Sequence, residues 1–230
     1  CVIDISERIT KIYFVRNSFV LPHDLWGAEF SEGVIKNAEQ ITAVNPTLNL
    51  NFEMVTPKLF FFEGGYGDKV QGWIMKPTNF VEGKKYPLAF LIHGGPEASF
   101  IQGWSYRWNP QLWLNRGYAV LMINPHGSPG SGQKFTDAVI NDWGGVPYHD
   151  LMQGMDYAAE NFPFVDKDNA CALGASYGGF MVNWIQGQTD RFKCLVTHDG
   201  VFSTVSMFYA TEELWFPMAE YCPVYKSGCK

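Results

Sequence analysis

The sequence predicts an α/β protein with a mostly parallel sheet and helices on both faces. Three observations carry this prediction. Continuous apolar runs, typical of strands buried on both faces, occur at 88–92, 118–123, 170–173 and 194–197. Helical segments alternate with them, at 111–115, 150–161 and 180–188. A glycine-rich or polar loop follows each strand, at the sheet edge where such proteins bind ligands.

The chain before these runs has a different pattern. Residues 1–50 predict short strands and turns, with a strand at 11–15 and two-residue alternation at 48–52. Nothing in this part is sufficient to form a sheet core alone. The segments 59–65 and 70–75 then predict a hairpin with a glycine-rich turn.

The loops after the four buried strands are expected to meet. They are 93–96, 124–128, 174–179 and 198–200. The helix predicted between the second and third strands has an apolar stripe that includes Leu151, Met155 and Ala158. Because the carboxyl ends of parallel strands share one edge, the four loops should converge on one place.

The stretch 174–179, Gly-Ala-Ser-Tyr-Gly-Gly, carries the clearest functional signal. Between a predicted strand and a predicted helix, this pattern is the nucleophile elbow of α/β-hydrolases. Gly174 and Gly178 remove Cβ atoms that would clash in so tight a turn, and the turn raises the Ser176 hydroxyl above the sheet. The N-terminus of the following helix favours negative charge that develops there. The alternative is a glycine-rich turn with an incidental serine.

An activated serine also needs an oxyanion hole. Its first donor should be the backbone N–H of Tyr177, the residue after the nucleophile. The second should come from the loop His-Gly-Gly-Pro at 93–96. We expect Gly95 to supply it, because glycine lets a substrate approach the backbone closely. The alternative is a plain tight turn.

The general base and its acid are not evident in the sequence. In this fold they follow the serine in the order Asp or Glu, then His. After Ser176 there is only His198, with Asp199 directly behind it. Successive strand residues point to opposite faces, so we do not expect these two to face each other and the serine. His93 and His126 are expected to be turn or packing residues.

Composition excludes some partners. The chain is 47% hydrophobic and 17% charged, which is typical of folded globular proteins. Its net charge of −6 argues against nucleic acid, and no apolar stretch approaches the length of a membrane span.

The five cysteines have no zinc-type spacing, and we expect neither a metal nor a cofactor. Cys171 and Cys194 are expected to be small buried residues of their strands. Cys222 and Cys229 could pair in an oxidising compartment.

Ordered motifs along the chain resemble the prolyl oligopeptidase family of serine peptidases, in particular its acylaminoacyl peptidase and secreted fungal dipeptidyl peptidase branches. The motifs are VQGWIMKP at 70–77, GKKYPL at 83–88, IHGGP at 92–96, NPHGS at 124–128, NDWGG at 141–145, GASYGG at 174–179 and EELWFP at 212–217. The resemblance covers about residues 50–217.

The resemblance implies roles for individual residues. Ser176 would be the nucleophile, and Gly95 and Tyr177 would supply the oxyanion hole. Phe208 and Trp215 would lie near the pocket for substrate side chains, although an aromatic stripe there is as often part of a core.

The resemblance also divides the chain. Residues 1–50 would be the remnant of the last β-propeller blade or blades. Residues 51–217 would be the N-terminal part of an α/β-hydrolase catalytic domain, incomplete at its C-terminal end. Residues 218–230 would be a divergent tail. The family's Asp and His are expected beyond Lys230, which would leave the strand at 194–197 as an exposed edge.

These inferences together predict a serine-type peptidase that hydrolyses short peptides through an acyl-enzyme on Ser176. The chain is expected to be a fragment that lacks the triad Asp and His. Two alternatives stay open: an esterase-like α/β-hydrolase and a catalytically inactive remnant. The resemblance implies secretion and short peptide substrates, with no nucleic acid or membrane as partner.

Overall fold

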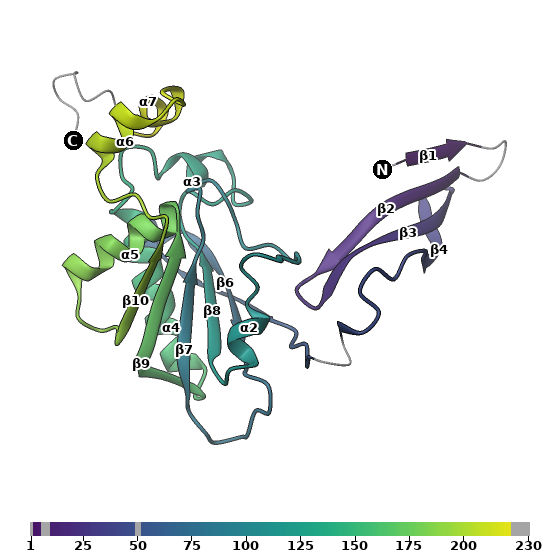
Figure 1. Cartoon of the computed structure of the whole chain (residues 1–230), viewed down its shortest axis with the longest axis horizontal. Helices are drawn as coiled ribbons and strands as arrows, with labels where there is room; N and C mark the ends of the chain where they lie inside the picture. Colours follow the sequence, from purple (N-terminus) through teal and green to yellow (C-terminus); the bar gives the residue numbers. More distant parts are fainter. Residues whose placement is uncertain (1, 6–9, 49–51, 222–230) are drawn as a thin grey trace.

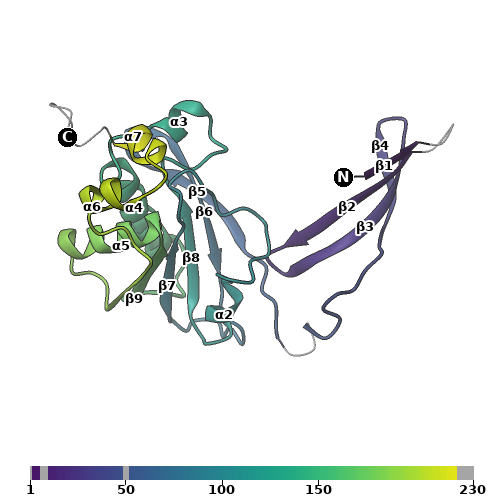
Figure 2. The ribbon, with the colours of Figure 1, turned by 45° about the horizontal axis from the view of Figure 1, so that its top comes forward.

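The computed structural model describes residues 2–5, 10–48 and 52–221. These residues form two sheets, which lie apart in Figures 1 and 2. The first is antiparallel, and each strand pairs with the next along the chain. Its strands are β1 (Val2–Ile5), β2 (Thr10–Ser18), β3 (Leu21–Ser31) and β4 (Val34–Gln40).

This N-terminal sheet buries little of its surface. Strand β4 is exposed along its whole length, whereas β3 contributes the buried Asp24 and Ala28. The predicted strand at 11–15 is confirmed as part of β2. The alternation predicted at 48–52 falls largely outside the described residues.

The second sheet has the order β10-β9-β7-β8-β6-β5. Strands β10, β9, β7 and β8 are parallel, whereas β6 and β5 form the predicted antiparallel hairpin at one edge. The strands are β5 (Lys58–Glu63), β6 (Lys69–Met75), β7 (Tyr86–Ile92), β8 (Ala119–Asn124), β9 (Val165–Ala175) and β10 (Cys194–His198). The predicted mostly parallel sheet is confirmed.

Helices α4 (Val146–Asn161) and α5 (Tyr177–Gln188) pack on one face of this sheet and α2 (Gln111–Leu114) on the other. The remaining helices are η1 (Gly65–Gly67), α3 (Gln133–Asp137), α6 (Thr204–Ala210) and α7 (Trp215–Glu220), of which α3, α6 and α7 lie beyond the carboxyl ends of the strands in Figure 1. Strand β7 shows the two-sided burial: Leu88 and Phe90 join the core under α4 and α5, and Ala89 joins the core on the α2 side. A strand buried on both faces needs a continuous apolar run, as predicted.

Two helices begin earlier than their apolar periodicity predicts. Helix α4 starts at Val146, whose N–H donates to Asp142 Oδ2 at 2.9 Å. Helix α5 starts at Tyr177, directly after the serine. Its first turn holds Gly178 and Gly179, whose poor helix propensity hides the true start from a sequence pattern.

The expectation that Cys171 and Cys194 are simply buried apolar residues is wrong, because they form a disulfide. The two residues are direct register partners on the parallel strands β9 and β10, with Cα atoms 4.5 Å apart. A linear sequence does not show which residues of neighbouring strands lie opposite each other. The possible pairing of Cys222 and Cys229 lies outside the described residues.

Candidate active site

Ser176 occupies a sharp turn between β9 and α5. Its backbone has φ 56° and ψ −119°, a conformation that costs a non-glycine residue free energy. Its N–H donates to the His198 carbonyl at 3.1 Å, and its own carbonyl accepts from the Phe180 N–H at 2.9 Å. The turn is thus tied both to β10 and to α5, and Ser176 itself is exposed.

Close backbone approaches explain the glycines around the serine. A Cβ at Gly174 would lie 2.2 Å from the carbonyl oxygen of Gly178, and one at Gly178 would lie 2.3 Å from that of Ile92. A Cβ at Gly179 would lie 2.5 Å from the Cα of Gly200. None of these positions can hold a side chain without moving backbone, so the motif is a packing requirement of the turn.

The loop after β7 packs against the serine. A Cβ on Gly94 would lie 3.3 Å from the Ser176 Cβ and 3.8 Å from its hydroxyl oxygen. Gly95 is exposed and has φ 120°, where a Cβ would lie 2.5 Å from the Glu97 nitrogen. The glycine pair therefore lets this loop turn close beside the nucleophile position.

His93 joins this loop to the one after β8. Its Nδ1 lies 2.7 Å from the Gly94 carbonyl, and its Nε2 lies 3.0 Å from Ser128 Oγ. Burial lowers the pKa of His93 to about 4, so the ring is neutral at pH 7. A carbonyl only accepts, so Nδ1 carries the proton and Nε2 accepts from Ser128. With both nitrogens engaged, His93 is a structural residue of the loop.

These contacts bring all four predicted loops together. In the loop 93–96, Gly94 lies beside Ser176, and His93 hydrogen-bonds Ser128 of the loop 124–128. The N–H of Ser176 donates to the carbonyl of His198, at the start of the loop 198–200. The predicted convergence at one sheet edge is confirmed.

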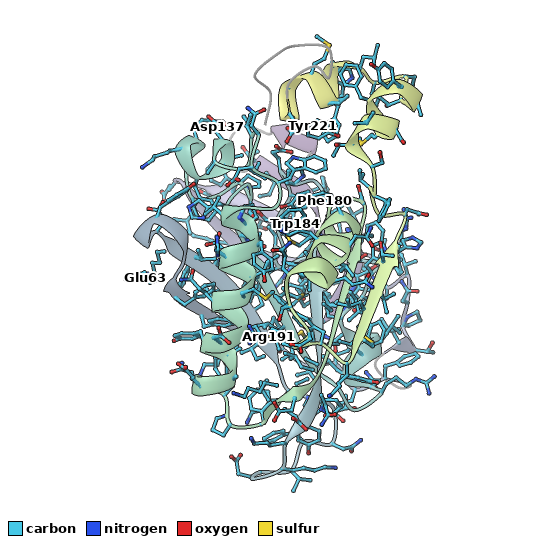
Figure 3. The ribbon with its side chains drawn as sticks, turned by 90° about the vertical axis from the view of Figure 1, so that its left-hand side faces the viewer. Glu63, Asp137, Phe180, Trp184, Arg191 and Tyr221 are labelled. Carbon is cyan, nitrogen blue, oxygen red and sulfur yellow. A yellow bond between two sulfur atoms is a disulfide. The ribbon has the colours of Figure 1, made fainter. Side chains whose placement is uncertain are left out.

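Tyr177 turns its side chain into the protein. Its hydroxyl donates to the Trp143 carbonyl at 2.7 Å, and burial, followed by the charge of Asp142, raises the pKa of Tyr177. The Trp143 ring packs edge-on against Tyr177 at 5.1 Å and against Phe180 at 5.3 Å. Figure 3 shows Phe180 and Trp184 together on α5. The loop that holds Trp143 therefore braces the start of α5.

The Trp143 indole also contacts one of two paired carboxyl groups, those of Glu220 and Glu97. Glu220 is buried and accepts from Trp143 Nε1 at 2.8 Å. Burial raises the pKa of Glu220 to about 7; its contact with the Glu97 carboxyl adds to the rise, and the Trp143 bond opposes it. Helix α7 runs through Pro217 and ends at the buried Glu220.

His198 and Asp199 lie closer together than their sequence predicts. Asp199 has a left-handed backbone, with φ 48°, so strand alternation ends at His198. His198 Nε2 lies 3.2 Å from Asp199 Oδ2, which corrects the expectation that the two side chains point apart. Among the described residues, no side chain hydrogen-bonds the Ser176 hydroxyl, so this pair does not complete a triad.

His126 is a packing residue, as predicted. It is buried, with Nδ1 2.6 Å from Asp150 Oδ2 and Nε2 3.2 Å from Asp68 Oδ2. Its ring stacks on Phe135 with centroids 4.0 Å apart. These contacts join the turn after β5, the loop after β8 and helix α4.

The two aromatic residues predicted near a substrate pocket differ in exposure. Phe208 on α6 is buried, whereas Trp215 at the start of α7 is largely exposed. Whether either contacts a substrate stays a prediction.

The described residues contain no helix long and apolar enough to cross a membrane. They also contain no cluster of three or more His, Cys, Asp or Glu side chains arranged to hold a metal ion.

Known proteins share both sequence and fold with this chain. The sequence pattern of the prolyl oligopeptidase family matches residues 104–226, which runs past the boundary suggested at Pro217. A dipeptidyl-peptidase 5 of Aspergillus fumigatus is 45% identical over 201 residues, covering 86% of this chain and 27% of the relative. A dipeptidyl-peptidase 5 of Schizosaccharomyces pombe is 45% identical over 175 residues, covering 75% of this chain and 26% of the relative.

The solved structures agree. An acylaminoacyl peptidase of Pyrococcus horikoshii superposes with a TM-score of 0.82 at 25% identity, covering 95% of this chain and 34% of that one. The chain thus spans about a quarter of the length of these curated relatives and a third of this solved structure. Because the family pattern covers more than half of its residues, the chain belongs to the prolyl oligopeptidase family.

Proposed function

We propose that this chain carries the nucleophile region of a serine-type peptidase that acts on short peptides. The observation that carries the proposal is Ser176, exposed in a left-handed turn between a strand and a helix. A hydroxyl presented in this way is the arrangement that α/β-hydrolases use for acyl transfer. Relatives named dipeptidyl-peptidase support a reaction that releases dipeptides.

In this proposal the Ser176 oxygen attacks the scissile carbonyl carbon and loses its proton to a base. The oxyanion would be held by the backbone N–H groups of Tyr177 and Gly95. Collapse breaks the C–N bond, the amine leaves with a proton, and the acyl group stays on Ser176 until water hydrolyses the ester. Phe208 and Trp215 would lie near the substrate side chains.

The proposal extends to domain organisation and compartment. Residues 1–50, which include the four-stranded N-terminal sheet, would be a propeller blade, and the following part to about Pro217 would be catalytic. The Cys171–Cys194 disulfide supports an oxidising compartment, and with it secretion.

A fluorophosphonate probe tests the proposal directly. It should label the chain on Ser176, and Ser176→Ala should abolish labelling while leaving the melting temperature unchanged. Ser203→Ala is the matched control, because Ser203 caps α6 and lies outside the elbow. Equal labelling of the Ser176→Ala variant, or none of the parent chain, would contradict the proposal.

One observation favours the alternative of a folded protein without turnover: no described side chain hydrogen-bonds the Ser176 hydroxyl. Dipeptide amides and short-chain esters separate the possibilities. Amide turnover supports the peptidase, ester turnover alone supports an esterase, and labelling without turnover of either supports the inactive protein.

A further inference from the structure

A series of hydrogen bonds connects the buried Glu220 of α7 to the residue after the nucleophile. Glu220 Oε2 accepts from Trp143 Nε1 at 2.8 Å, and the Trp143 carbonyl accepts from the Tyr177 hydroxyl at 2.7 Å. Tyr177 is 1% exposed, and its ring packs edge-on against the Trp143 ring at 5.1 Å. Because a buried, closely packed ring cannot move independently of its surroundings, a shift of Trp143 also shifts the Tyr177 backbone.

The same carboxyl group contacts the loop that holds the other oxyanion donor. Glu220 contacts the Glu97 carboxyl, and Glu97 lies two residues after Gly95. The turn between these two positions is tight. The Ala98 N–H donates to the Pro96 carbonyl at 2.8 Å, and a Cβ on Gly95 would lie 2.5 Å from the Glu97 nitrogen. A force on the Glu97 side chain therefore acts close to the Gly95 N–H.

Ionisation of Glu220 changes the charge where these contacts meet. Burial raises the pKa of Glu220 to about 7, and the Glu97 carboxyl adds to the rise. Tyr221, the next residue, is neutral at this pH, because burial and the Glu220 charge raise its pKa. The Asp142 carboxylate faces the start of α4, where it accepts a backbone N–H. Glu220 and Glu97 therefore share a proton below neutral pH and repel each other above it.

We propose that Glu220 and Trp143 are positioning residues for both donors of the oxyanion hole. The inference rests on the proposed function, in which the N–H groups of Tyr177 and Gly95 hold the oxyanion. Tyr177 is the first residue of α5, so its N–H has no acceptor within that helix. Protonated Glu220 holds Trp143 and Glu97 together and keeps the two donors directed at one point. Ionised Glu220 repels Glu97, and the donors then converge less well on one oxygen.

Nuclear magnetic resonance of the isotope-labelled chain tests the inference without catalysis. The Trp143 indole N–H resonance reports the ionisation of Glu220 directly. The backbone amide resonances of Tyr177 and Gly95 should titrate with the same midpoint, near pH 7. Glu220→Gln should abolish this titration, because the neutral amide still accepts from Trp143 at every pH. Glu97→Gln should move the midpoint to lower pH, because the carboxyl that raises the pKa of Glu220 is gone.

Fluorophosphonate labelling rates measure the effect on the chemistry. The rate for the Glu220→Gln variant divided by that for the parent should be close to one at pH 5 and rise about tenfold by pH 8. This change is smaller than the roughly 100-fold or greater cost of removing an oxyanion donor, because the donor is displaced and not lost. Glu160→Gln is the matched control, because Glu160 is exposed near the end of α4, and its ratio should stay near one at both pH values.

The inference would be overturned if the Trp143 indole did not titrate, or if it titrated while the amides of Tyr177 and Gly95 did not. Equal amide titration in the parent and the Glu220→Gln variant would also overturn it, as would a ratio of labelling rates that does not change with pH. Amide titration in a chain that fluorophosphonate does not label would uphold the coupling to Glu220 and remove the proposed function. Labelling of Ser176 without amide titration would remove only the positioning role.

Discussion

At the residue scale, the elbow is shaped by backbone crowding. Ser176 adopts φ 56°, which costs a non-glycine residue on the order of 1–3 kcal/mol, and its neighbours hold it there. Gly178 is one of these constraints, because the carbonyl oxygens of Ile92 and His93 occupy the space that its side chain would take. The end of the neighbouring strand β7 therefore helps to hold Ser176 in its strained conformation.

Gly178→Ala should destabilise the chain by about 3 kcal/mol, because the clash is with backbone that cannot move aside. It should also reduce fluorophosphonate labelling of Ser176. Gly187→Ala, in the same helix, is the control: its Cβ would have no atom within 4 Å, and alanine favours the helix by about 0.5–1 kcal/mol. Urea unfolding checks both, and equal stability of the two variants would contradict the packing argument.

Glu220 makes the stability of the chain depend on pH as neutrality is approached. Its pKa is about 7 in the folded chain, against an ordinary value of 4.5. Between these values the folded state binds the proton more tightly than the unfolded state does, so this contribution is present below pH 4.5 and is lost as the pH rises towards 7.

Glu220→Gln should abolish the loss of stability between pH 4.5 and 7, because a neutral amide still accepts from Trp143 and does not repel Glu97. Melting temperatures of the variant should exceed those of the parent at pH 8 and match them at about pH 4. Glu213→Gln, an exposed change with no effect expected, is the control. A parallel pH profile for the parent and the Glu220→Gln variant would rule the interpretation out.

At the element scale, the edge strand β10 is held to β9 by both pairing and covalent bonding. Strand β10 is exposed at most positions, so its own burial contributes little. The Cys171–Cys194 disulfide closes a segment with a sequence separation of 23 residues that contains all of α5. Closing such a loop lowers the conformational entropy of the unfolded chain and so stabilises the folded one. The bond also holds β10 against β9, and the His198 carbonyl of β10 accepts the N–H of Ser176.

Replacing both cysteines by alanine should lower the free energy of unfolding by about 3 kcal/mol, as expected for a loop of this length. The melting temperature of the parent should fall on treatment with dithiothreitol, and that of the double variant should not respond. A double variant as stable as the oxidised parent would show that the bond adds nothing to stability.

At the scale of the whole molecule, an apolar anchor helps to connect the two sheets. Phe19, in the turn between β2 and β3, is buried in the core on the α2 side and packs edge-on against Trp73 at 5.6 Å. Its carbonyl accepts from Gln111 Nε2 at 3.0 Å. Together with the hydrogen bond from the Trp104 N–H to Asn17 Oδ1 at 2.8 Å, this contact fixes the N-terminal sheet to the loop between β7 and α2.

Phe19→Ala should therefore lower the free energy of unfolding by about 3–5 kcal/mol and make the segment between the sheets more accessible. Limited proteolysis should cleave the variant faster within residues 41–57 than it cleaves the parent. Phe30→Ala is the control, because Phe30 is 41% exposed on β3 and its loss should change little. Equal cleavage rates for the parent and the Phe19→Ala variant would mean that the sheets are held together elsewhere.

Much of this organisation could be predicted from local patterns. Apolar runs located the central strands because a strand buried on both faces has no polar side. Small residues around Ser176 indicated the elbow because only glycine tolerates such close backbone approach. Both signals can be seen within a few residues of the chain, although part of their cause, such as the Ile92 carbonyl beside Gly178, lies far away in the sequence.

The sequence by itself determined the order of strands and helices, the position of the serine and the edge at which four loops meet. Only the tertiary structure decided that Cys171 lies opposite Cys194, that Asp199 turns back to His198, and that Glu220 reaches Trp143 beside the elbow. Each of these contacts joins residues through strand register or an irregular turn. Both depend on how the whole chain packs, and no local pattern of residues records them.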